Sequence, residues 1–577
     1  MNRKLTFIFL LSWLVSGCDT SLPSEEANND AVITSGEAAT LTSSEYASLD
    51  SEAKYQVANK LAGALYKGVP VDEFFNVSAG MRSLQTTSTG DNYIDDFRRA
   101  INTDLDADTL NQIKAEIYGL DVNGNIQEDA AKYRFSSSDQ PKEEPYALIY
   151  DYPLSRNSFI ASIALFLSNT IMFTCAEEME STNVNDCQKT YTYLVTQLNK
   201  KATIRETIRG YMPSIMNWRI GRSGQNVGVE GMEEFLGLFD RAADADKVGI
   251  ACQDIILLPE DQDYELSQTN FPNTQPQIIL QEDTNGDGIV DSGGSFITTC
   301  EDFYNVVAGH ALTLPRVCEV VTNYFLAGQE SDDRLAFCNS LLASGVDDFE
   351  SLFKGVIFSR EYLLEAEHVV GYDRFVLPML STLHWDVRIG SGDLNPNVWR
   401  NMASNTFNSM YMGRMSWDTM TMKIGRLGAV PMDALSFINY HNSIRSDIFF
   451  NSNAWVGRRV NIDGTDVYIP GLLFMSDEVL DPSLDQDTTE DSVLRPEIEA
   501  LSPEDYLKFL FLTALKRSPT SEESTALLQE FESRGHWFLD SDNIPDMRDS
   551  RFDDMARDTF DYISRLSETY YYRRVNS

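Results

Sequence analysis

The sequence predicts a mainly α-helical protein: a large multi-helix globular body with small β-hairpin and loop insertions, stabilised by disulfides. Three observations support this fold class. Hydrophobic residues make up 42% of the 577 residues and charged residues 23%, which is typical of a globular chain. Apolar residues recur at helical spacing in many segments. Six cysteines follow the first fifty residues, and an even number suits disulfide pairing.

The N-terminal half contains several helical patterns. Residues 51–66 place apolar side chains on one helical face, and a Gly-Val-Pro stop follows them. Two short helices are expected within 93–118, and more helices within 188–217 and 231–243. The apolar run 159–173 contains serine, asparagine and threonine, so it is interpreted as a buried helix and not as a membrane span.

The C-terminal half carries clear helix signals. Residues 349–357 form one apolar stripe, which must face a core. Ser502 followed by Pro503 is typical of a helix start, because serine caps the first turn and proline suits its first position. Thr520 to Glu523 has the spacing of a capping box, and a final helix is expected around 555–566.

Two acidic stretches, 259–295 and 476–497, interrupt the helical pattern. Short β-like runs at 277–280 and 466–469 predict one or two small hairpins. The expected organisation, in chain order, is a signal peptide over 1–17, a flexible tether over 18–50, an N-terminal helical region over 51–250, an acidic insertion over 251–300, a central helical region over 301–475, an acidic linker over 476–497 and a C-terminal helical region over 498–577.

The net charge of −42 restricts the partners of this protein. Such an acidic surface repels phosphates, so nucleic acid is excluded as an expected partner. Anionic lipid headgroups are disfavoured for the same reason. Cations and cationic partners fit better.

The first eighteen residues carry a targeting signal. Arg3 and Lys4 precede an apolar run over 5–15, which is too short to span a bilayer as a stable helix. The sequence Val-Ser-Gly-Cys then ends at Cys18 and resembles the lipobox of bacterial lipoproteins. The resemblance implies cleavage before Cys18, lipidation of its sulfur, and a body held at a membrane in the periplasm or at the cell surface of a bacterium. Cleavage removes two positive charges and changes the net charge from −42 to −44. The alternative is an ordinary signal peptide with an incidental cysteine.

Three helical segments carry a second resemblance. Residues 317–321, 352–363 and 515–523 resemble segments of large helical, exported bacterial proteins of unknown function. The resemblance implies a helical, exported body. It provides no catalytic residues that could be transferred to this chain.

The six cysteines of the body suit an oxidising compartment outside the cytoplasm. Cys175 and Cys187 are the likeliest local pair, because they enclose a short polar segment. Fifteen pairings exist in principle, and one plausible set adds two further bridges; these are Cys252–Cys300 and Cys318–Cys338. The alternative is that some of the six are buried thiols. The sequence contains no C-x-x-C, which disfavours zinc ribbons and thioredoxin-like redox chemistry.

The sharpest chemical motif is a cation loop over 283–291, D-x-N-x-D-G-x-x-D, which resembles the calcium loops of EF-hands, dockerins and thrombospondin-type repeats. The expected ligands are the side chains of Asp283, Asn285, Asp287 and Asp291 and the carbonyl of Ile289. The loop departs from an EF-hand, because its twelfth position is Gly294 and the preceding segment looks extended. A further ligand must come from Glu282, Asp302 or water. The predicted cofactor is therefore a structural calcium ion, and the alternative is a polar turn without metal.

Catalytic signals are few. The sequence contains no G-x-S-x-G, H-E-x-x-H, Walker A or G-x-G-x-x-G motif. His384 and His441 lie in polar-aromatic clusters that could line a groove near 384–441. Seven methionines within 402–432 could bind Cu(I), but their aromatic neighbours favour a packed core.

These observations predict a lipid-anchored exported envelope or cell-surface protein with a binding or assembly role, stabilised by calcium. Its expected partners are the membrane, through the lipid, and another exported protein or a polysaccharide. The alternative is an exported hydrolase or polysaccharide-processing accessory with a groove near 384–441.

Overall fold

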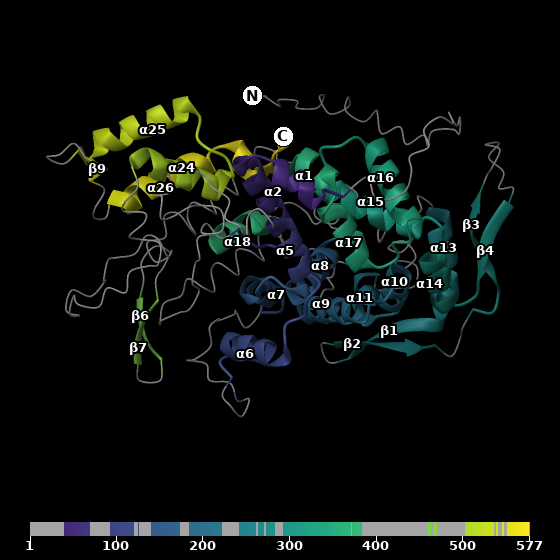
Figure 1. Cartoon of the computed structure of the whole chain (residues 1–577). Helices are drawn as coiled ribbons and strands as arrows, with labels where there is room; N and C mark the ends of the chain where they lie inside the picture. Colours follow the sequence, from purple (N-terminus) through teal and green to yellow (C-terminus); the bar gives the residue numbers. More distant parts are fainter. Residues whose placement is uncertain are drawn as a thin grey trace, which may run out of the picture.

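The prediction of a mainly α-helical fold is confirmed by a computed structural model of the chain (Figure 1). The structure describes residues 40–69, 93–120, 125, 140–172, 184–221, 242–260, 263–269, 273–282, 292–370, 372–382, 458–462, 465–469, 502–535, 538–539, 545–546 and 551–575. The helices before the first hairpin are α1 (Ser43–Ser48), α2 (Ser51–Gly63), α5 (Tyr93–Ala100), α6 (Ala107–Tyr118), α7 (Gln140–Asp151), α8 (Arg156–Asn169), α9 (Val184–Asn199), α10 (Ile204–Tyr211), α11 (Ile215–Gly221) and α13 (Ala242–Ala251).

The later helices follow a short 3₁₀ turn, η4 (Cys252–Asp254), and the first two hairpins. They are α14 (Cys300–Gly309), α15 (Thr313–Phe325), α16 (Ser331–Ala343), α17 (Phe349–Ile357), the π-helical turn η5 (Glu361–Glu365), α18 (Tyr372–Thr382), α24 (Pro503–Leu515), α25 (Ser521–Arg534), α26 (Arg551–Ser564) and the 3₁₀ turn η7 (Ser567–Tyr570). The predicted starts of α24 and α25 are confirmed. Ser502 accepts a hydrogen bond from the Asp505 N–H, and Thr520 forms a capping box with Glu523.

The folded body begins earlier than expected. Residues 18–50 are predicted to be a tether, whereas α1 already occupies Ser43–Ser48. Thr42 and Glu45 form a capping box at its start, and Leu41 and Tyr46 are fully buried. These two apolar side chains anchor a segment whose overall composition is polar, which explains the difference. The predicted helix over 231–243 lies almost wholly outside the described residues.

The described strands form two-stranded antiparallel pairs. They are β1 (Ile255–Glu260) with β2 (Asp263–Gln268), β3 (Gln277–Glu282) with β4 (Ser292–Ile297), β5 (His368–Val369) with β10 (Tyr571–Tyr572), β6 (Arg458–Ile462) with β7 (Thr465–Ile469), and β8 (Phe538–Leu539) with β9 (Pro545–Asp546). The predicted β-like runs at 277–280 and 466–469 are thus confirmed as parts of β3 and β7. Figure 1 shows β1 to β4 at one end of the molecule and α24 to α26 at the other.

An aromatic cluster lies in the centre of the core. The ring of Phe166 on α8 packs edge-on against Tyr324 and Phe353, with centroids 5.3 Å apart in both pairs. Phe325 on α15 packs edge-on against Tyr362 at the same centroid distance. Edge-to-face pairs of this kind contribute about 0.5–1.5 kcal/mol each beyond the area they bury. They join α8, α15, α17 and η5 into one body.

Several of the few cations are buried at helix C-termini, where carbonyl groups lack partners within the helix. Lys60 donates to the carbonyls of Tyr362 in η5 and of Ala366 directly after it, at 3.3 and 2.8 Å. Lys67 donates to the last carbonyls of α7, and Arg374 to those of Gly63 and Ala64 at the end of α2. The interior therefore uses cations to bind helix ends that come from distant parts of the chain.

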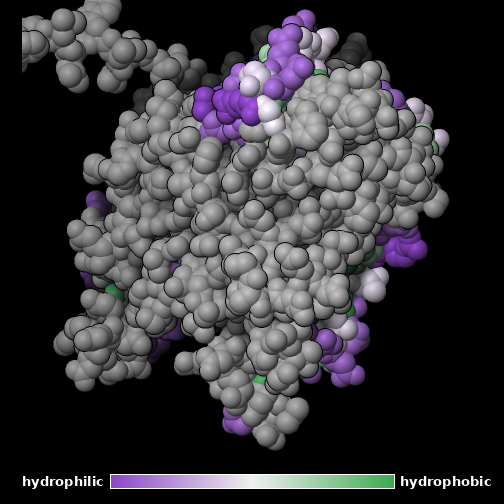
Figure 2. All heavy atoms as spheres, turned by 90° about the vertical axis from the view of Figure 1, so that its left-hand side faces the viewer, coloured by the Kyte–Doolittle hydropathy of each residue, from purple (hydrophilic) through white to green (hydrophobic). Residues whose placement is uncertain are grey.

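The exterior is correspondingly polar. Figure 2, viewed from the side on which α25 lies in Figure 1, shows mainly hydrophilic colours where the described atoms reach the surface. Among the described residues, no helix is long and apolar enough to cross a membrane.

Candidate functional site

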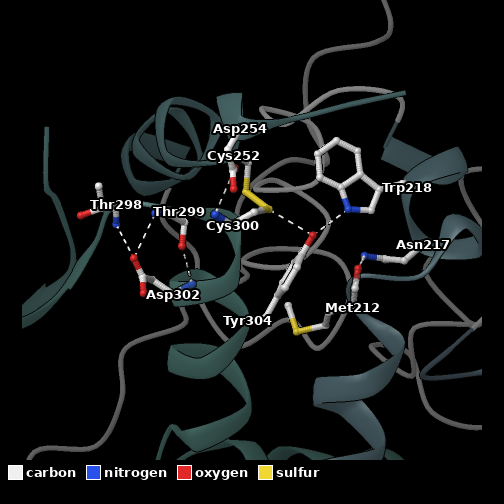
Figure 3. Close-up of a disulfide and its surroundings, with 10 residues drawn as sticks. All are labelled: Met212, Asn217, Trp218, Cys252, Asp254, Thr298, Thr299, Cys300, Asp302 and Tyr304. Atoms are coloured by element: carbon white, nitrogen blue, oxygen red, sulfur yellow. Dashed lines mark hydrogen bonds between the residues drawn. A yellow bond between two sulfur atoms is a disulfide. The ribbon is translucent and has the colours of Figure 1, made fainter. Parts of the chain in front are cut away.

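The first candidate site is the acidic insertion, which a disulfide closes at its base (Figure 3). Cys252 follows α13 and Cys300 begins α14; their sulfurs are bonded, and both residues are fully buried. The segment between them carries β1 to β4 and the predicted cation loop. The bond therefore holds both ends of the insertion on the helical body. Cys318 and Cys338 form a second disulfide between α15 and α16, so both of these predicted pairs are confirmed.

A hydrogen-bonded aromatic pair covers the first disulfide. Trp218 on α11 donates its indole N–H to the Tyr304 hydroxyl at 2.6 Å, and the Tyr304 O–H lies 3.1 Å from the Cys300 sulfur, to which it can donate. Figure 3 shows both rings beside the sulfur–sulfur bond. Burial raises the pKa of Tyr304, so its hydroxyl stays protonated at any physiological pH. The Trp218–Tyr304 pair therefore supports the disulfide as a rigid packing element.

Carboxylates fix the backbone at the same base. Asp302 accepts from the backbone N–H groups of Thr298 and Thr299 at 2.8 and 3.0 Å, and these hydrogen bonds lower the pKa of its carboxyl. Asp254 accepts from the Cys300 N–H at 3.3 Å, but burial raises its pKa. Asp302 thus serves as the capping-box partner at the start of α14. This capping role accounts for the position of the Asp302 carboxylate, and a calcium ion is not needed to explain it.

The predicted calcium ligands Asp283, Asn285, Asp287, Ile289 and Asp291 lie outside the described residues. Their two flanks are described and pair with each other, with Glu282 opposite Ser292 in the antiparallel register of β3 and β4. The ends of the loop are therefore held side by side. Within the described residues, no group of His, Cys, Asp and Glu side chains is arranged to hold a metal ion.

The side chains of the remaining predicted site residues are also not among those that the structure describes. Cys18 and Cys175 lie outside the described residues. Cys187 lies in α9, but its side chain is not described. The segment 384–441, with its histidines and methionines, also lies outside the described residues. The lipidation, the Cys175–Cys187 pair and the groove therefore stay predictions.

The second candidate site is a small cavity that the sequence does not predict. Its volume is about 30 Å³, and it lies between α2, α18, the end of α24 and the C-terminal strand β10. We call it the Arg374 pocket. Its polar lining consists of Asn59, Arg374, Lys516, Glu568, Thr569, Tyr571 and Tyr572.

Two cations give the Arg374 pocket its chemistry. Arg374 is 3% exposed and lies over the ring of Tyr66 at 4.2 Å from its centroid. Lys516 follows α24 in the left-handed conformation, at φ 60°, and its ammonium donates to the Thr513 carbonyl. Burial of this ammonium lowers the pKa of Lys516 to about 7, although the residue is partly exposed. A cationic cavity is unusual in a chain with 88 acidic residues.

Tight packing holds the walls of the pocket. A Cβ atom on Gly63 would lie 2.0 Å from the Tyr572 hydroxyl, and one on Gly68 would lie 2.3 Å from the Pro378 carbonyl. Only glycine permits these approaches of α2 and its following turn to β10 and α18. The sequence signal that points toward this site is a basic pair, Lys516 and Arg517, directly after the mostly apolar run 506–515.

No protein-family model matches the chain, and no curated protein or solved structure is found to be similar to it.

Proposed function

We propose that this chain is an exported bacterial lipoprotein, anchored by a lipid on Cys18, whose acidic helical body has a binding or assembly role in the cell envelope. The observation that carries the proposal is the pair of disulfides, Cys252–Cys300 and Cys318–Cys338. Disulfides persist in oxidising compartments, and the N-terminal sequence carries the signal that would deliver the body to one.

Lipidation is tested by expressing the whole chain in bacteria with a labelled fatty acid. The wild-type protein should take up the label and sediment with membranes. The variant Cys18→Ser should lose the label, because only the cysteine sulfur accepts the lipid. Cys338→Ser is the matched control and should keep it. Equal labelling of wild type and Cys18→Ser would refute the lipoprotein assignment.

The binding or assembly role is supported by the absence from the sequence of the common catalytic motifs. The partner is proposed to be another exported protein or a polysaccharide, and it is sought by crosslinking in native membranes. The alternative, a hydrolase with a groove near 384–441, predicts turnover of a polysaccharide, ester or peptide. Turnover that disappears in His384→Ala without a loss of thermal stability would favour the hydrolase over a binding role.

Calcium is proposed as a structural ion in the loop 283–291. The support is its alternating Asp and Asn residues and the β3–β4 pair that holds its ends together. The affinity expected of an extracellular site is about 10⁻⁴–10⁻³ M. At ten times the dissociation constant, the ion should stabilise the protein by about 1.4 kcal/mol.

Thermal unfolding tests this ion directly. Calcium should raise the melting temperature of the wild-type protein, and a chelator should reverse the rise. The variant Asp287→Asn should lose the response, whereas Asp121→Asn, in the shorter sequence D-x-N-x-N over 121–125 that lacks the full pattern, should keep it. The same response in both variants would argue against a site at 283–291.

A further inference from the structure

The Arg374 pocket has an excess of positive charge. Arg374 and Lys516 line it, and Glu568 is the carboxylate that lines it with them. The Glu568 carboxylate is already paired with Arg517, whose Nε lies 3.1 Å from it, and with Arg573. Glu568 is therefore not available to neutralise Lys516.

The charges next to the pocket lead to the same conclusion. Asp373 is the carboxyl nearest to Arg374 along the chain, and it accepts from the Arg374 backbone N–H at 2.8 Å. Glu523 makes a two-pronged ion pair with Arg517, at 2.7 and 2.9 Å. Glu367 also attracts Arg573 electrostatically, so the neighbouring carboxylates interact with the arginines of this region.

Lys516 forms no ion pair with a carboxylate within the described residues, and burial alone lowers the pKa of its ammonium. The one hydrogen bond of its ammonium within the described residues goes to a neutral acceptor, the Thr513 carbonyl. An ammonium in such surroundings loses hydration without gaining a counter-charge, and this is costly unless an anion binds. The remaining polar wall contains Asn59, which is 3% exposed and keeps one amide hydrogen bond to the Tyr55 carbonyl at 2.8 Å.

The volume limits what can bind. About 30 Å³ holds roughly two water-sized groups, since one water needs about 10–15 Å³ on this measure. An anion of one or two heavy atoms matches this volume better than a phosphate or a larger carboxylic acid, and a single positive charge needs a single negative one. We propose that the Arg374 pocket binds one small monovalent anion, with chloride as the fitting representative, between Arg374 and Lys516.

This anion would stabilise a long-range contact. The pocket walls come from α2 and α18 on one side and from the C-terminal segment on the other. Ser518 in that segment also donates to Glu52 on α2, from its backbone N–H at 3.3 Å and its hydroxyl at 3.1 Å. An anion on Lys516 would therefore strengthen the docking of residues 502–575 onto the N-terminal helices.

The test is thermal unfolding of the mature chain in sodium chloride and in sodium gluconate at the same ionic strength, about 0.15 M. Gluconate is too large for the pocket, so screening is equal and only site binding differs. Chloride should give the higher melting temperature, and the difference should saturate as chloride replaces gluconate. The variant Lys516→Met should abolish the difference. Lys508→Met removes a lysine within α24 that does not line the pocket and should leave the difference unchanged.

Equal melting temperatures of the wild type in the two salts would overturn the proposal, as would a chloride-specific rise that Lys516→Met retains. If Lys516→Met fails to fold, ³⁵Cl line broadening by the wild-type protein decides the matter. Broadening that bromide reverses at saturable concentrations supports the site, and broadening that bromide leaves unchanged overturns it.

Discussion

The replacement Glu350→Ala should strongly destabilise the protein, because it leaves a buried guanidinium without its main partner. Glu350 on α17 accepts from Arg156 on α8 at 2.8 Å, and both side chains are 9% exposed. Arg156 also donates to the Leu198 carbonyl at the end of α9, at 3.3 Å. One ion pair thus joins three helices. Breaking a buried pair on one side typically costs about 3–5 kcal/mol.

For Glu350→Ala, the loss of stability should lie near the lower limit of this range, because other partners remain. Asp104 remains 3.3 Å from Arg156 after the replacement, but it is 60% exposed and weakly held. Lys354, which also pairs with Glu350, keeps a hydrogen bond to Asn102 at 2.6 Å. We therefore expect a loss of about 3 kcal/mol. Urea unfolding followed by far-UV circular dichroism measures it as a shift of the midpoint.

Two further variants separate the ion pair from general damage. Glu530→Ala breaks a pair with Arg534 in which both side chains are 51% exposed, so it should cost at most about 0.5 kcal/mol. The double replacement Arg156→Met with Glu350→Leu removes both charges and should recover stability relative to Glu350→Ala. The reasoning is wrong if Glu350→Ala costs no more than Glu530→Ala, or if the double variant is the least stable.

The same pair predicts a pH dependence. Burial raises the pKa of Glu350, but hydrogen bonds from Arg156 and Lys354 outweigh it and place the pKa below the ordinary 4.5. A carboxyl with a depressed pKa stabilises the fold above the unfolded value and loses this contribution as pH falls through the folded value. The stability difference between wild type and Glu350→Gln should therefore be constant above pH 4.5 and shrink below it. A difference that grows on acidification would contradict this sign.

Three further outcomes are expected. Replacing Cys318 and Cys338 together by alanine opens a bridge across 20 residues and should cost about 3.3 kcal/mol, measured by urea unfolding. Gly68→Ala should cost about 1–3 kcal/mol, because its Cβ would lie 2.4 Å from the Thr382 backbone nitrogen, whereas Gly309→Ala meets no atom within 4 Å and should be tolerated. Added sodium gluconate should raise the melting temperature, because screening relieves the repulsion of a chain with net charge −42; a lower melting temperature would show that repulsion is not limiting.

Features with local causes could be predicted from the sequence. The capping signals at Ser502 and Thr520 involve residues three positions apart, and both helices begin where those residues indicate. The same spacing occurs at Thr42 and Glu45, and it marks the start of the folded body. The strand β3 could also be predicted from the sequence, because its short apolar run indicates an extended segment.

Features that depend on distant residues could not be predicted. Lys60 binds the carbonyl of Tyr362, 302 residues away, and Arg374 binds that of Ala64, 310 residues away. A lysine within an apolar helix does not indicate which helix end it will bind. The Arg374 pocket combines such contacts from four parts of the chain, so its residues carry no common motif. The disulfide pairs are an intermediate case, because Cys252–Cys300 and Cys318–Cys338 belong to one plausible set, but fifteen pairings are open from the sequence.

The distribution of the cations links these features. The chain has 46 lysines and arginines against 88 acidic residues, and some of the cations are buried on helix ends or in the Arg374 pocket. Because these cations lie inside, the exterior carries more of the negative charge than the composition alone implies. Free cations in solution can screen that exterior, whereas the interior excess around Lys516 needs an anion of fitting size. Salt should therefore act on this protein in two separable ways, one that depends on ionic strength at the surface and one that depends on the identity of the anion at a single pocket.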